Sequence, residues 1–311
     1  FDFKPVASAS VAQVHIGVLR SSAGGDGLKV AVKVQHEKIA EIMESDMVAF
    51  RRIIRFIAWL NPAFESAKII LKAWQNEMLK ELDFHNEADN IRTVRRNLRK
   101  AGMISDGDRD YADTTYQGSQ VVVPRVVEEF VGRTVFCMSF VQGFKITDLE
   151  QMTLFGVDRH ALMKKIVEAY SIQLYVDGVF NADPHAGNLM VSISDDGTAR
   201  PVLLDFGMVV TLPESQRVGY ASLVHSLSQL SSSGVSEAIA KVGYENSQSK
   251  AKPERDMEFF AHLMRDTGDR KSQRRSQKAF RTRRKTQRKM DKADDPESQG
   301  RFFKQFPESL I

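Results

Sequence analysis

One loop and the strand pair that follows it constrain the fold of this 311-residue chain more than any other feature. The loop reads "FNADPHAGN" and places Asp183 five residues before Asn188. The apolar run "LMVSIS", a "DDG" turn and the run "ARPVLLDF" come next and predict a β-hairpin that ends at Asp205. From the residues alone, Asp183, His185 and Asn188 are compatible with a metal site, a catalytic loop or a well-capped turn.

The first half of the chain predicts a small strand-rich region interrupted by helices. A glycine-containing turn separates two β-branched runs, which predicts a hairpin. Apolar residues at helical spacing then predict at least two helices that are separated at Pro62, followed by a polar loop. The expected strands span residues 11–19, 29–35, 121–127 and 134–141, the helical region spans about 37–99, and the loop spans 101–119.

The second half is predominantly helical. An apolar stripe predicts a helix from about Arg159 to Asp177, with Gly178 as its C-cap. A helical remainder is expected from about residue 214 to 266. We therefore predict an α+β, two-lobed fold with a strand-rich N-lobe (residues 1–143), a helical C-lobe (144–268) and a basic tail (269–311), for which a disordered segment is one interpretation.

Charge is unevenly distributed along the chain. Residues 270–292 hold twelve Lys and Arg residues against one Asp, a net charge of +11; since the whole chain carries +4, the rest carries −7. The tail predicts either a solvated segment or contact with an anionic membrane surface. Aromatic residues are not interleaved with the basic ones, so nucleic acid is not an expected partner.

The ordered motifs match the parts that phosphoryl transfer needs. Lys33 lies in "VAVK" on the second expected strand, which matches the V-A-I-K strand motif of protein kinases; alone it is equally well an ordinary edge-strand lysine. The spacing of Asp183 and Asn188 is that of the kinase catalytic loop, and "DFG" supplies Asp205. Asn188 and Asp205 offer the hard oxygen donors that Mg²⁺ prefers, which leaves Asp183 as the base or hydroxyl-orienting group.

Two features of the sequence differ from those of ordinary protein kinases. The nucleotide-covering loop is "PVASASVAQVH" instead of a glycine-rich loop, and no A-P-E motif follows "DFG". The lysine's partner should come from "KELDFHNEADN", where Glu81 and Glu87 are expected on different faces of a helix, so that only one faces Lys33.

With these departures, the motifs "PVASASVAQVH", "VAVKVQ", "ELDFHNEADN", "FNADPHAGN" and "LLDFGM" closely resemble the UbiB family of atypical kinase-like proteins over about residues 1–240. The resemblance implies an atypical kinase fold that binds ATP and Mg²⁺. It also implies ATPase activity or phosphorylation of small molecules, in support of ubiquinone or other isoprenoid-lipid metabolism. Two residues depart from the usual family loop: Asn181 replaces a histidine and Ala186 a proline.

The resemblance also assigns roles to individual residues. Asp183 would be the catalytic aspartate, Lys33 the phosphate lysine and Glu87 its partner. His185 would either contact the terminal phosphate or stabilise the loop. The remaining assignments are Ala7, Ser8, Ala9, Ser10, Met138 and Phe140 for the nucleotide, Asn188 and Asp205 for the metal, and Glu81 and Asp83 for the E-x-D element.

The partners that the resemblance implies are ATP, lipid or quinone-precursor molecules, an anionic membrane and a biosynthetic complex. The implied location is intracellular, in a mitochondrion or in a plastid or other membrane-associated compartment. Two other functions fit the residues, a protein serine/threonine kinase and a non-catalytic lipid-binding scaffold. The family's K-x-G-Q helix is not found in this sequence, which begins at Phe1, so we expect the sequence to be a fragment of a longer protein.

Overall fold

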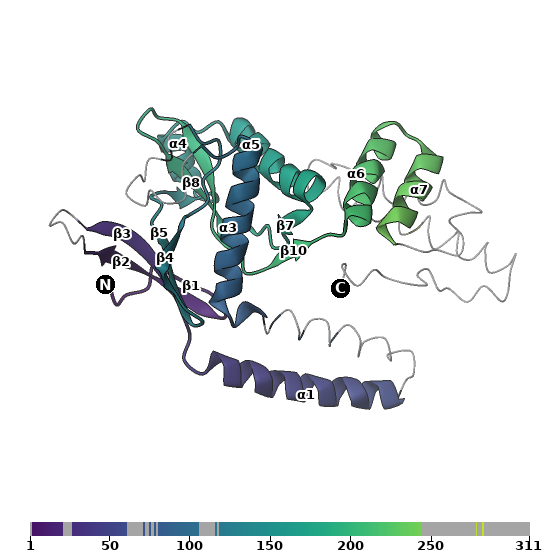
Figure 1. Cartoon of the computed structure of the whole chain (residues 1–311), viewed down its shortest axis with the longest axis horizontal. Helices are drawn as coiled ribbons and strands as arrows, with labels where there is room; N and C mark the ends of the chain where they lie inside the picture. The colour runs from purple at the N-terminus through teal and green to yellow at the C-terminus, as the bar shows by residue number, and fades with distance from the viewer. Residues whose placement is uncertain are drawn as a thin grey trace, which may run out of the picture. The chain divides into compact units, whose positions relative to one another are not determined.

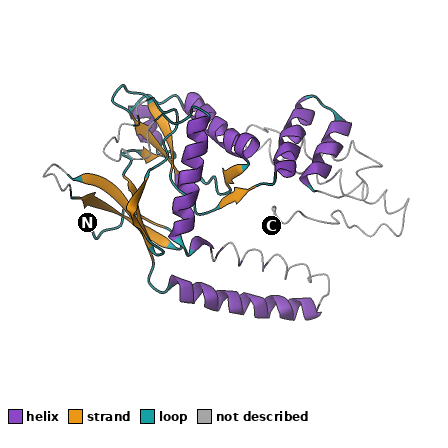
Figure 2. Cartoon of the chain, in the orientation of Figure 1, coloured by secondary structure: helices purple, strands orange, loops and turns teal. Residues whose placement is uncertain are grey.

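The computed structural model describes residues 2–20, 27–60, 80–105, 116 and 118–243. It also describes the single residues 71, 75, 78, 278 and 282. They belong to two compact units, Phe1–Leu212 and the unit that begins at Pro213. Figure 2 distinguishes helices from strands. The helices are α1 (Ile39–Leu60), α3 (Phe84–Lys100), α4 (Leu149–Leu154), α5 (Arg159–Ser171), the π-helical η2 (Ile172–Asp177), the 3₁₀ turn η3 (Ala186–Asn188), α6 (Glu214–Ser228) and α7 (Ser232–Val242). The strands are β1 (Ala7–Ser8), β2 (Ala12–Leu19), β3 (Leu28–Gln35), β4 (Val126–Val131), β5 (Val135–Ser139), β6 (Phe144–Lys145), β7 (Val179–Asn181), β8 (Leu189–Ile193), β9 (Ala199–Leu203) and β10 (Val209–Thr211).

An antiparallel sheet in the order β1-β2-β3-β5-β4 carries the first part of the candidate site. Its register places four residues in one row across the strands, since Ala7 pairs with Val14, Val14 with Lys33, and Lys33 with Phe136. Directly opposite residues point to the same face of a sheet. Ala7, the first residue of the alanine-rich loop, and Lys33 therefore lie in one cross-strand row.

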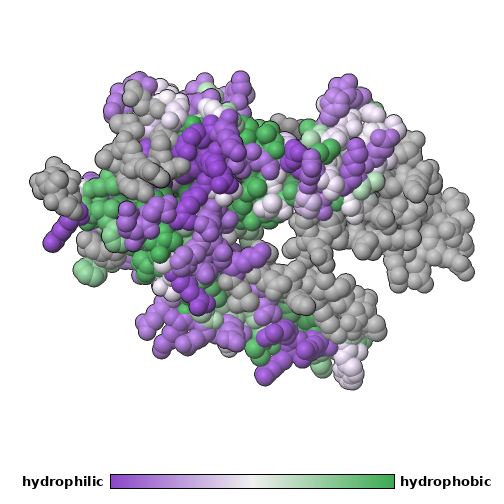
Figure 3. All heavy atoms as spheres, viewed as in Figure 1, coloured by the Kyte–Doolittle hydropathy of each residue, from purple (hydrophilic) through white to green (hydrophobic). Residues whose placement is uncertain are grey.

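Helix α3 packs on the face of the sheet to which Lys33 belongs (Figure 1). Phe84 and Ile91 of α3 join Ala31, Phe136 and Met138 of the strands in one core cluster. The rings of Phe84 and Phe136 meet edge to face with centroids 5.5 Å apart. In Figure 3 the viewer sees hydrophilic side chains along α3, so the helix is amphipathic and its apolar face holds it against the sheet.

The hairpin of β2 and β3 confirms the first predicted strand pair. The prediction of a strand over residues 121–127 was wrong, because β4 begins only at Val126. Pro124 explains the shift, since proline has no backbone N–H to donate to a ladder. The residues before it instead connect to the second sheet, where Val122 forms an isolated bridge with Val202.

The second part of the site belongs to two smaller sheets, β6-β8-β9 and β10-β7. The hairpin of β8 and β9 is antiparallel from Leu189–Leu203 to Ile193–Ala199, as the sequence predicts. The predicted helix from Arg159 also forms, but its last six residues are π-helical η2, and Gly178 ends it at φ 69°. Only glycine adopts this left-handed conformation without strain.

In the second unit α6 packs against α7. Within the described residues, none of the helices is long and apolar enough to cross a bilayer. The predicted tail (269–311) lies outside the described residues except for Lys278 and Thr282. The predicted lobe and tail boundaries stay predictions. The chain is a mixed α and β protein with antiparallel sheets, as its sequence indicates.

Truncating the centre of the α3–sheet core should destabilise the first unit. Ile91 has no exposed surface, so Ile91→Ala removes buried methyl groups and leaves a cavity. We expect it to lower the free energy of unfolding by about 2–5 kcal/mol. The control Val167→Ala truncates a side chain that is 57% exposed on α5, and we expect a change below about 0.5 kcal/mol. Urea unfolding of both variants measures the difference, and equal losses would contradict this account of the core.

Candidate nucleotide-binding site

A buried ion pair between Lys33 and Glu87 joins the sheet to α3. Lys33 Nζ donates to both carboxylate oxygens of Glu87, at 2.6 and 2.8 Å. The two side chains are 14% and 5% exposed. Lys33 Nζ also lies 5.5 Å from the centroid of the Phe84 ring. The lysine is therefore held in one position by a bidentate partner and an aromatic face.

Burial and the neighbouring charges shift the pKa values of both groups. Burial alone lowers the pKa of Lys33, but the carboxylates of Glu87 and Asp205 outweigh it and raise the pKa overall. Burial, together with the charge of Asp205, raises the pKa of Glu87 overall, although the charge and hydrogen bond of Lys33 and a backbone hydrogen bond from Phe206 lower it. Lys33 is thus a permanent cation at neutral pH, as a group that contacts phosphate must be.

Asp205 brings the "DFG" segment to the same ion pair. Its Oδ2 lies 3.6 Å from Lys33 Nζ, while its Oδ1 accepts from the backbone N–H of Gly207 at 2.9 Å. Asn90, one turn beyond Glu87 on α3, donates from Nδ2 to the carbonyl oxygen of Phe206 at 2.9 Å. Helix α3 therefore holds both the lysine and the segment that follows β9.

Asn181 connects the catalytic-loop motif to Asp205. Its Nδ2 donates to the carbonyl oxygen of Asp205 at 2.6 Å, and its Oδ1 accepts from the backbone N–H of Asp183 at 2.9 Å. The backbone N–H of Asn181 donates to Gln173 Oε1 at 3.2 Å, and Gln173 Nε2 donates to the carbonyl oxygen of Ala169 at 3.3 Å. Asn181 and Gln173 are buried. This chain of amides fixes the backbone of Asp183 relative to that of Asp205.

The loop from Asp183 to Asn188 is closed by its own side chains. Asn188 Nδ2 lies 3.3 Å from Asp183 Oδ2, and the His185 ring nitrogen Nδ1 accepts from the backbone N–H of Gly187 at 3.0 Å. His185 caps the turn η3 in this way. The observed contact fits the predicted loop-stabilising role, whereas contact with a phosphate stays a prediction.

The side-chain oxygens of Asn188 and Asp205 are suitable ligands for a Mg²⁺ ion that is also bound by nucleotide phosphates. Within the described residues, no three His, Cys, Asp or Glu side chains gather closely enough to hold a metal. Mg²⁺ is usually held by one or two carboxylates together with substrate phosphates and water. Asp205 offers a carboxylate that is 38% exposed, and the amide contact with Asp183 leaves Asn188 Oδ1 as an acceptor. Asn188 and Asp205 would thus hold a phosphate-bound ion.

The E-x-D residues occupy a different place from the one the sequence predicts. Asp83 is the N-cap of α3 and accepts from the backbone N–H of His85 at 3.0 Å. Hydrogen bonds from the His85 side chain and backbone lower the pKa of Asp83. Glu81 precedes this cap, so the prediction that Glu81 and Glu87 share one helix was wrong. Glu87 is the acidic residue that pairs with Lys33.

The predicted nucleotide-contacting residues lie at the sheet edge and along β5. Ala7 and Ser8 form β1, Ala9 and Ser10 form the turn to β2, and the backbone N–H of Ala9 donates to the carbonyl oxygen of Ala12 at 2.8 Å. Met138 is buried opposite Ala31. The side chain of Phe140 lines a cavity that is described below, and its contact with a nucleotide stays a prediction.

Sequence reasoning did not identify Asn90, Gln173 and Tyr170 as part of this region. Burial and the charge of Asp183 raise the pKa of Tyr170 to about 12. Each of the three lies on a helix as an isolated polar residue among apolar or charged neighbours. Asn181 differs, because its departure from the family's histidine was visible in the sequence.

Comparison with known proteins agrees with this geometry. A family model described as the ABC1 atypical kinase-like domain matches residues 1–239. AarF domain-containing protein kinase 1 of Gallus gallus is 32% identical over 224 residues, 72% of this chain and 39% of the relative. The chloroplastic Protein ACTIVITY OF BC1 COMPLEX KINASE 8 of Arabidopsis thaliana is 28% identical over 247 residues, 78% of this chain and 29% of the relative. The chain thus spans less than half the length of these curated relatives.

A solved structure shows a similar fold. It is titled "The complex structure of Rv3197-erythromycin from Mycobacterium tuberculosis", has 21% sequence identity and a TM-score of 0.50, and the alignment covers 87% of this chain and 66% of that one. Together with the strand lysine, the helix glutamate and the two loop motifs, these matches define an atypical kinase-like protein. The chain belongs to the ABC1 family of such proteins, the UbiB family that its motifs predict.

The ion pair makes a specific prediction about stability. Lys33→Met leaves the buried carboxylate of Glu87 without its partner, and we expect a loss of about 3–5 kcal/mol in the free energy of unfolding. The double variant Lys33→Met/Glu87→Leu removes both charges and should recover most of that loss. Urea unfolding of the three proteins measures both effects. A double variant that is less stable than Lys33→Met would show that the ion pair does not determine the stability here.

The amide chain makes a separate prediction about the loop. Asn181→Leu removes the acceptor of the Asp183 N–H, and we expect that amide to exchange its hydrogen about tenfold faster or more. Asn181→Asp keeps an acceptor oxygen for the Asp183 N–H but loses the donor to the carbonyl oxygen of Asp205, so it should retain more protection than Asn181→Leu. Hydrogen exchange followed by NMR measures the Asp183 amide in each variant, and unchanged protection in Asn181→Leu would contradict the proposed link.

Proposed function

We propose that this protein is an ATP-binding, Mg²⁺-dependent atypical kinase or ATPase. The observation that carries the proposal is the bidentate pairing of Lys33 with Glu87 beside Asp205. A lysine that two carboxylates hold in place is ready to contact the phosphates of a nucleotide without reorganisation. The family match supports phosphoryl chemistry in general.

Each group has a role in the proposed reaction. Lys33 contacts the nucleotide phosphates, and Glu87 orients Lys33. Asn188 and Asp205 hold Mg²⁺, which when bound neutralises charge on the phosphates. Asp183 is exposed and orients the acceptor hydroxyl or water, while Asn181 holds its backbone in place.

ATP hydrolysis or transfer to a small molecule is favoured over transfer to a peptide. Only residues 206–213 lie between Asp205 and the start of α6, and this segment includes strand β10. Strand β10 pairs with β7 from Val209 to Thr211. No extended segment after "DFG" is therefore present to dock a peptide. A protein serine/threonine kinase remains the second hypothesis, and phosphorylation of a peptide library would reveal it.

The biological setting is also part of the proposal. We propose that the protein acts in ubiquinone or other isoprenoid-lipid metabolism in a mitochondrion or plastid. The chloroplastic relative in Arabidopsis thaliana supports an organellar location. Lipid or quinone precursors, an anionic membrane surface and a biosynthetic complex are the proposed partners, and the net charge of +11 over residues 270–292 supports membrane contact. A non-catalytic lipid-binding scaffold is the third hypothesis.

The catalytic proposal is tested by Asp205→Asn. We expect Mg²⁺-dependent ATP turnover to fall about 100-fold or more, because the amide provides no charge to hold the metal against the phosphates. The matched control Asp46→Asn changes an exposed acid on α1 and should leave turnover unchanged. Calorimetry of ATP with and without Mg²⁺ gives the affinities, and phosphate release gives the rates.

Two results would contradict the proposal. One is a wild-type protein that binds no Mg²⁺-ATP. The other is Asp205→Asn with wild-type turnover. Full cellular function of Asp205→Asn, together with loss of function on deleting residues 269–311, would instead favour the scaffold hypothesis.

A further inference from the structure

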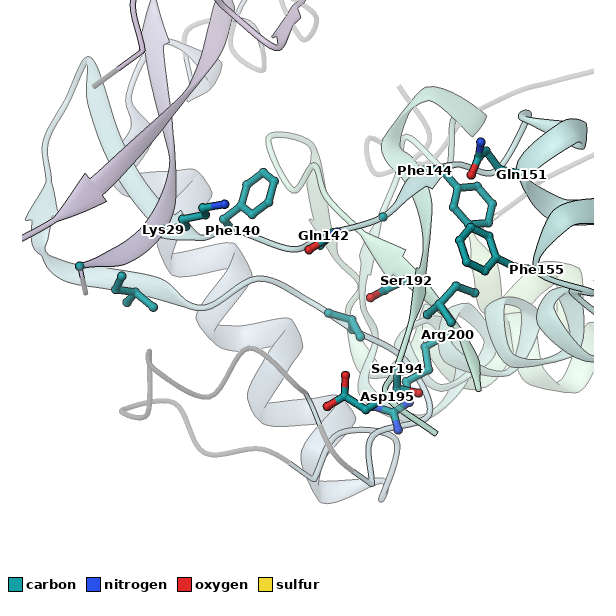
Figure 4. A pocket seen from close by; sticks show the side chains of 15 residues that line it. Lys29, Phe140, Gln142, Phe144, Gln151, Phe155, Ser192, Ser194, Asp195 and Arg200 are labelled. Atoms are coloured by element: carbon teal, nitrogen blue, oxygen red, sulfur yellow. The ribbon is translucent and has the colours of Figure 1, made fainter. Parts of the chain in front are cut away.

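The first unit contains a cavity of about 800 Å³, and Figure 4 shows the side chains that line it. Its walls come from five segments, which are the start of β3, Val122, the segment from Phe140 to Phe144, helix α4 with Phe155, and the β8–β9 hairpin near its turn. None of Lys33, Glu87, Asp183, Asn188 and Asp205 lines it. The volume lies within the range of about 300–1,000 Å³ that small-molecule sites occupy.

Aromatic rings form two walls of the cavity. The rings of Phe144 and Phe155 stack with centroids 5.7 Å apart and an angle of 10° between their planes. Figure 4 shows Phe140 and Lys29 on the other side of the space. Phe155 is 49% exposed, so part of its ring is available to a ligand. Such walls favour a planar aromatic group, which can extend the stack of the two rings.

Charged and polar groups complement these rings. The lining includes two basic residues, Lys29 and Arg200, and one acidic residue, Asp195, so their net charge is +1. Arg200 is buried and donates from Nη1 to the carbonyl oxygen of Tyr116 at 2.6 Å, which fixes the cavity floor. Lys29 is exposed, and its side chain lies beside Phe140 in Figure 4. These groups favour a ligand with an anionic group at the end that faces Lys29.

The cavity wall is held in place by close packing. A Cβ atom at Gly143 would lie 2.3 Å from the carbonyl oxygen of Val191, so only glycine permits this approach to β8. On the other side, the backbone N–H of Phe140 donates to the carbonyl oxygen of Lys29 at 3.3 Å. The segment between β5 and β6, which forms one wall of the cavity, is thus held against β8 on one side and β3 on the other.

We propose that this cavity is a second ligand site, which takes a planar aromatic molecule bearing an anionic group. The β8–β9 hairpin connects this site to the candidate catalytic site. At its turn end, Ser192 and Asp195 line the cavity; at its open end, β8 directly follows Asn188 and β9 ends two residues before Asp205. Ligand binding that shifts the hairpin therefore changes the affinity for Mg²⁺-ATP, and by linkage Mg²⁺-ATP changes the affinity for the ligand equally. The coupling rests on the proposed function, whereas the binding does not.

The probe is 2-naphthoate, with the neutral 2-naphthamide and the non-aromatic cyclohexanecarboxylate as comparisons. Ligand-observed NMR titrations of the 311-residue chain, with and without saturating Mg²⁺-ATP, measure the dissociation constants. We expect 2-naphthoate to bind about five- to tenfold more tightly than either comparison compound. Its binding should persist with Mg²⁺-ATP present.

Two variants locate the binding at the cavity. Phe155→Ala and Lys29→Gln should each weaken 2-naphthoate binding about fivefold or more. The matched controls Phe130→Ala and Lys164→Gln change exposed residues outside the lining and should have no effect. Thermal unfolding shows that each variant is folded, and Lys29 is an exposed residue whose replacement leaves the core unchanged.

The outcomes separate the cavity from the proposed function. Equal affinity in wild type, Phe155→Ala and Lys29→Gln overturns the second site, and so does complete displacement of 2-naphthoate by Mg²⁺-ATP. Binding of 2-naphthoate by a protein that binds no Mg²⁺-ATP would support the cavity and overturn the proposed function. Binding of Mg²⁺-ATP by a protein that does not bind 2-naphthoate would overturn the second site and leave the proposed function supported.

Discussion

The ion pair of Lys33 and Glu87 is the interaction on which the rest of the site depends. Two opposite charges that are 14% and 5% exposed are costly to bury separately, but the bidentate contacts at 2.6 and 2.8 Å compensate each charge. Lys33 belongs to the sheet and Glu87 to α3. Separation of the helix from the sheet would therefore break this ion pair together with the apolar core between them, where Phe84 and Phe136 pack.

Neutral amides extend this rigid arrangement to the loops. Asn90 holds Phe206 from α3, while Asn181 holds the backbones of Asp183 and Asp205 together. An amide carries no charge between acidic and basic pH, in contrast to the histidine that the family usually has at position 181. The link between the two aspartates in this chain is therefore independent of pH.

Much of the fold followed from local signals in the sequence. The β-branched runs and glycine-containing turns predicted the β2–β3 and β8–β9 hairpins, and the apolar stripe with Gly178 predicted the helix from Arg159. The strand at 121–127 failed because the tertiary bridge of Val122 to Val202 and the effect of Pro124 outweigh β propensity. Glu81 was placed on the wrong element because Asp83 begins a new helix there.

The site was accessible to sequence reasoning only in part. Motif spacing identified Lys33, Asp183, Asn188 and Asp205, because these groups need fixed neighbours along the chain, but their roles stay predictions. The supporting residues are different in kind. Gln173 lies within the helix predicted from Arg159 to Asp177, yet its side-chain hydrogen bonds depend on the π-helical turn and on Asn181 eight residues later. The cavity likewise combines five segments that no single stretch of sequence brings together.

In the reaction we propose, the exposure of Asp183 affects which molecule accepts the phosphoryl group, water or a metabolite. Asp183 is exposed, and the residues after Asp205 enter strand β10 within four positions. Within the described residues, no long segment that could dock a peptide therefore lies between Asp205 and Pro213, where the next unit begins. Water is present at tens of molar concentration and reaches an exposed carboxylate freely, so any other acceptor must bind closely enough to displace it. Hydrolysis is thus the default reaction of this arrangement, and transfer to a metabolite requires a binding surface that excludes water from Asp183.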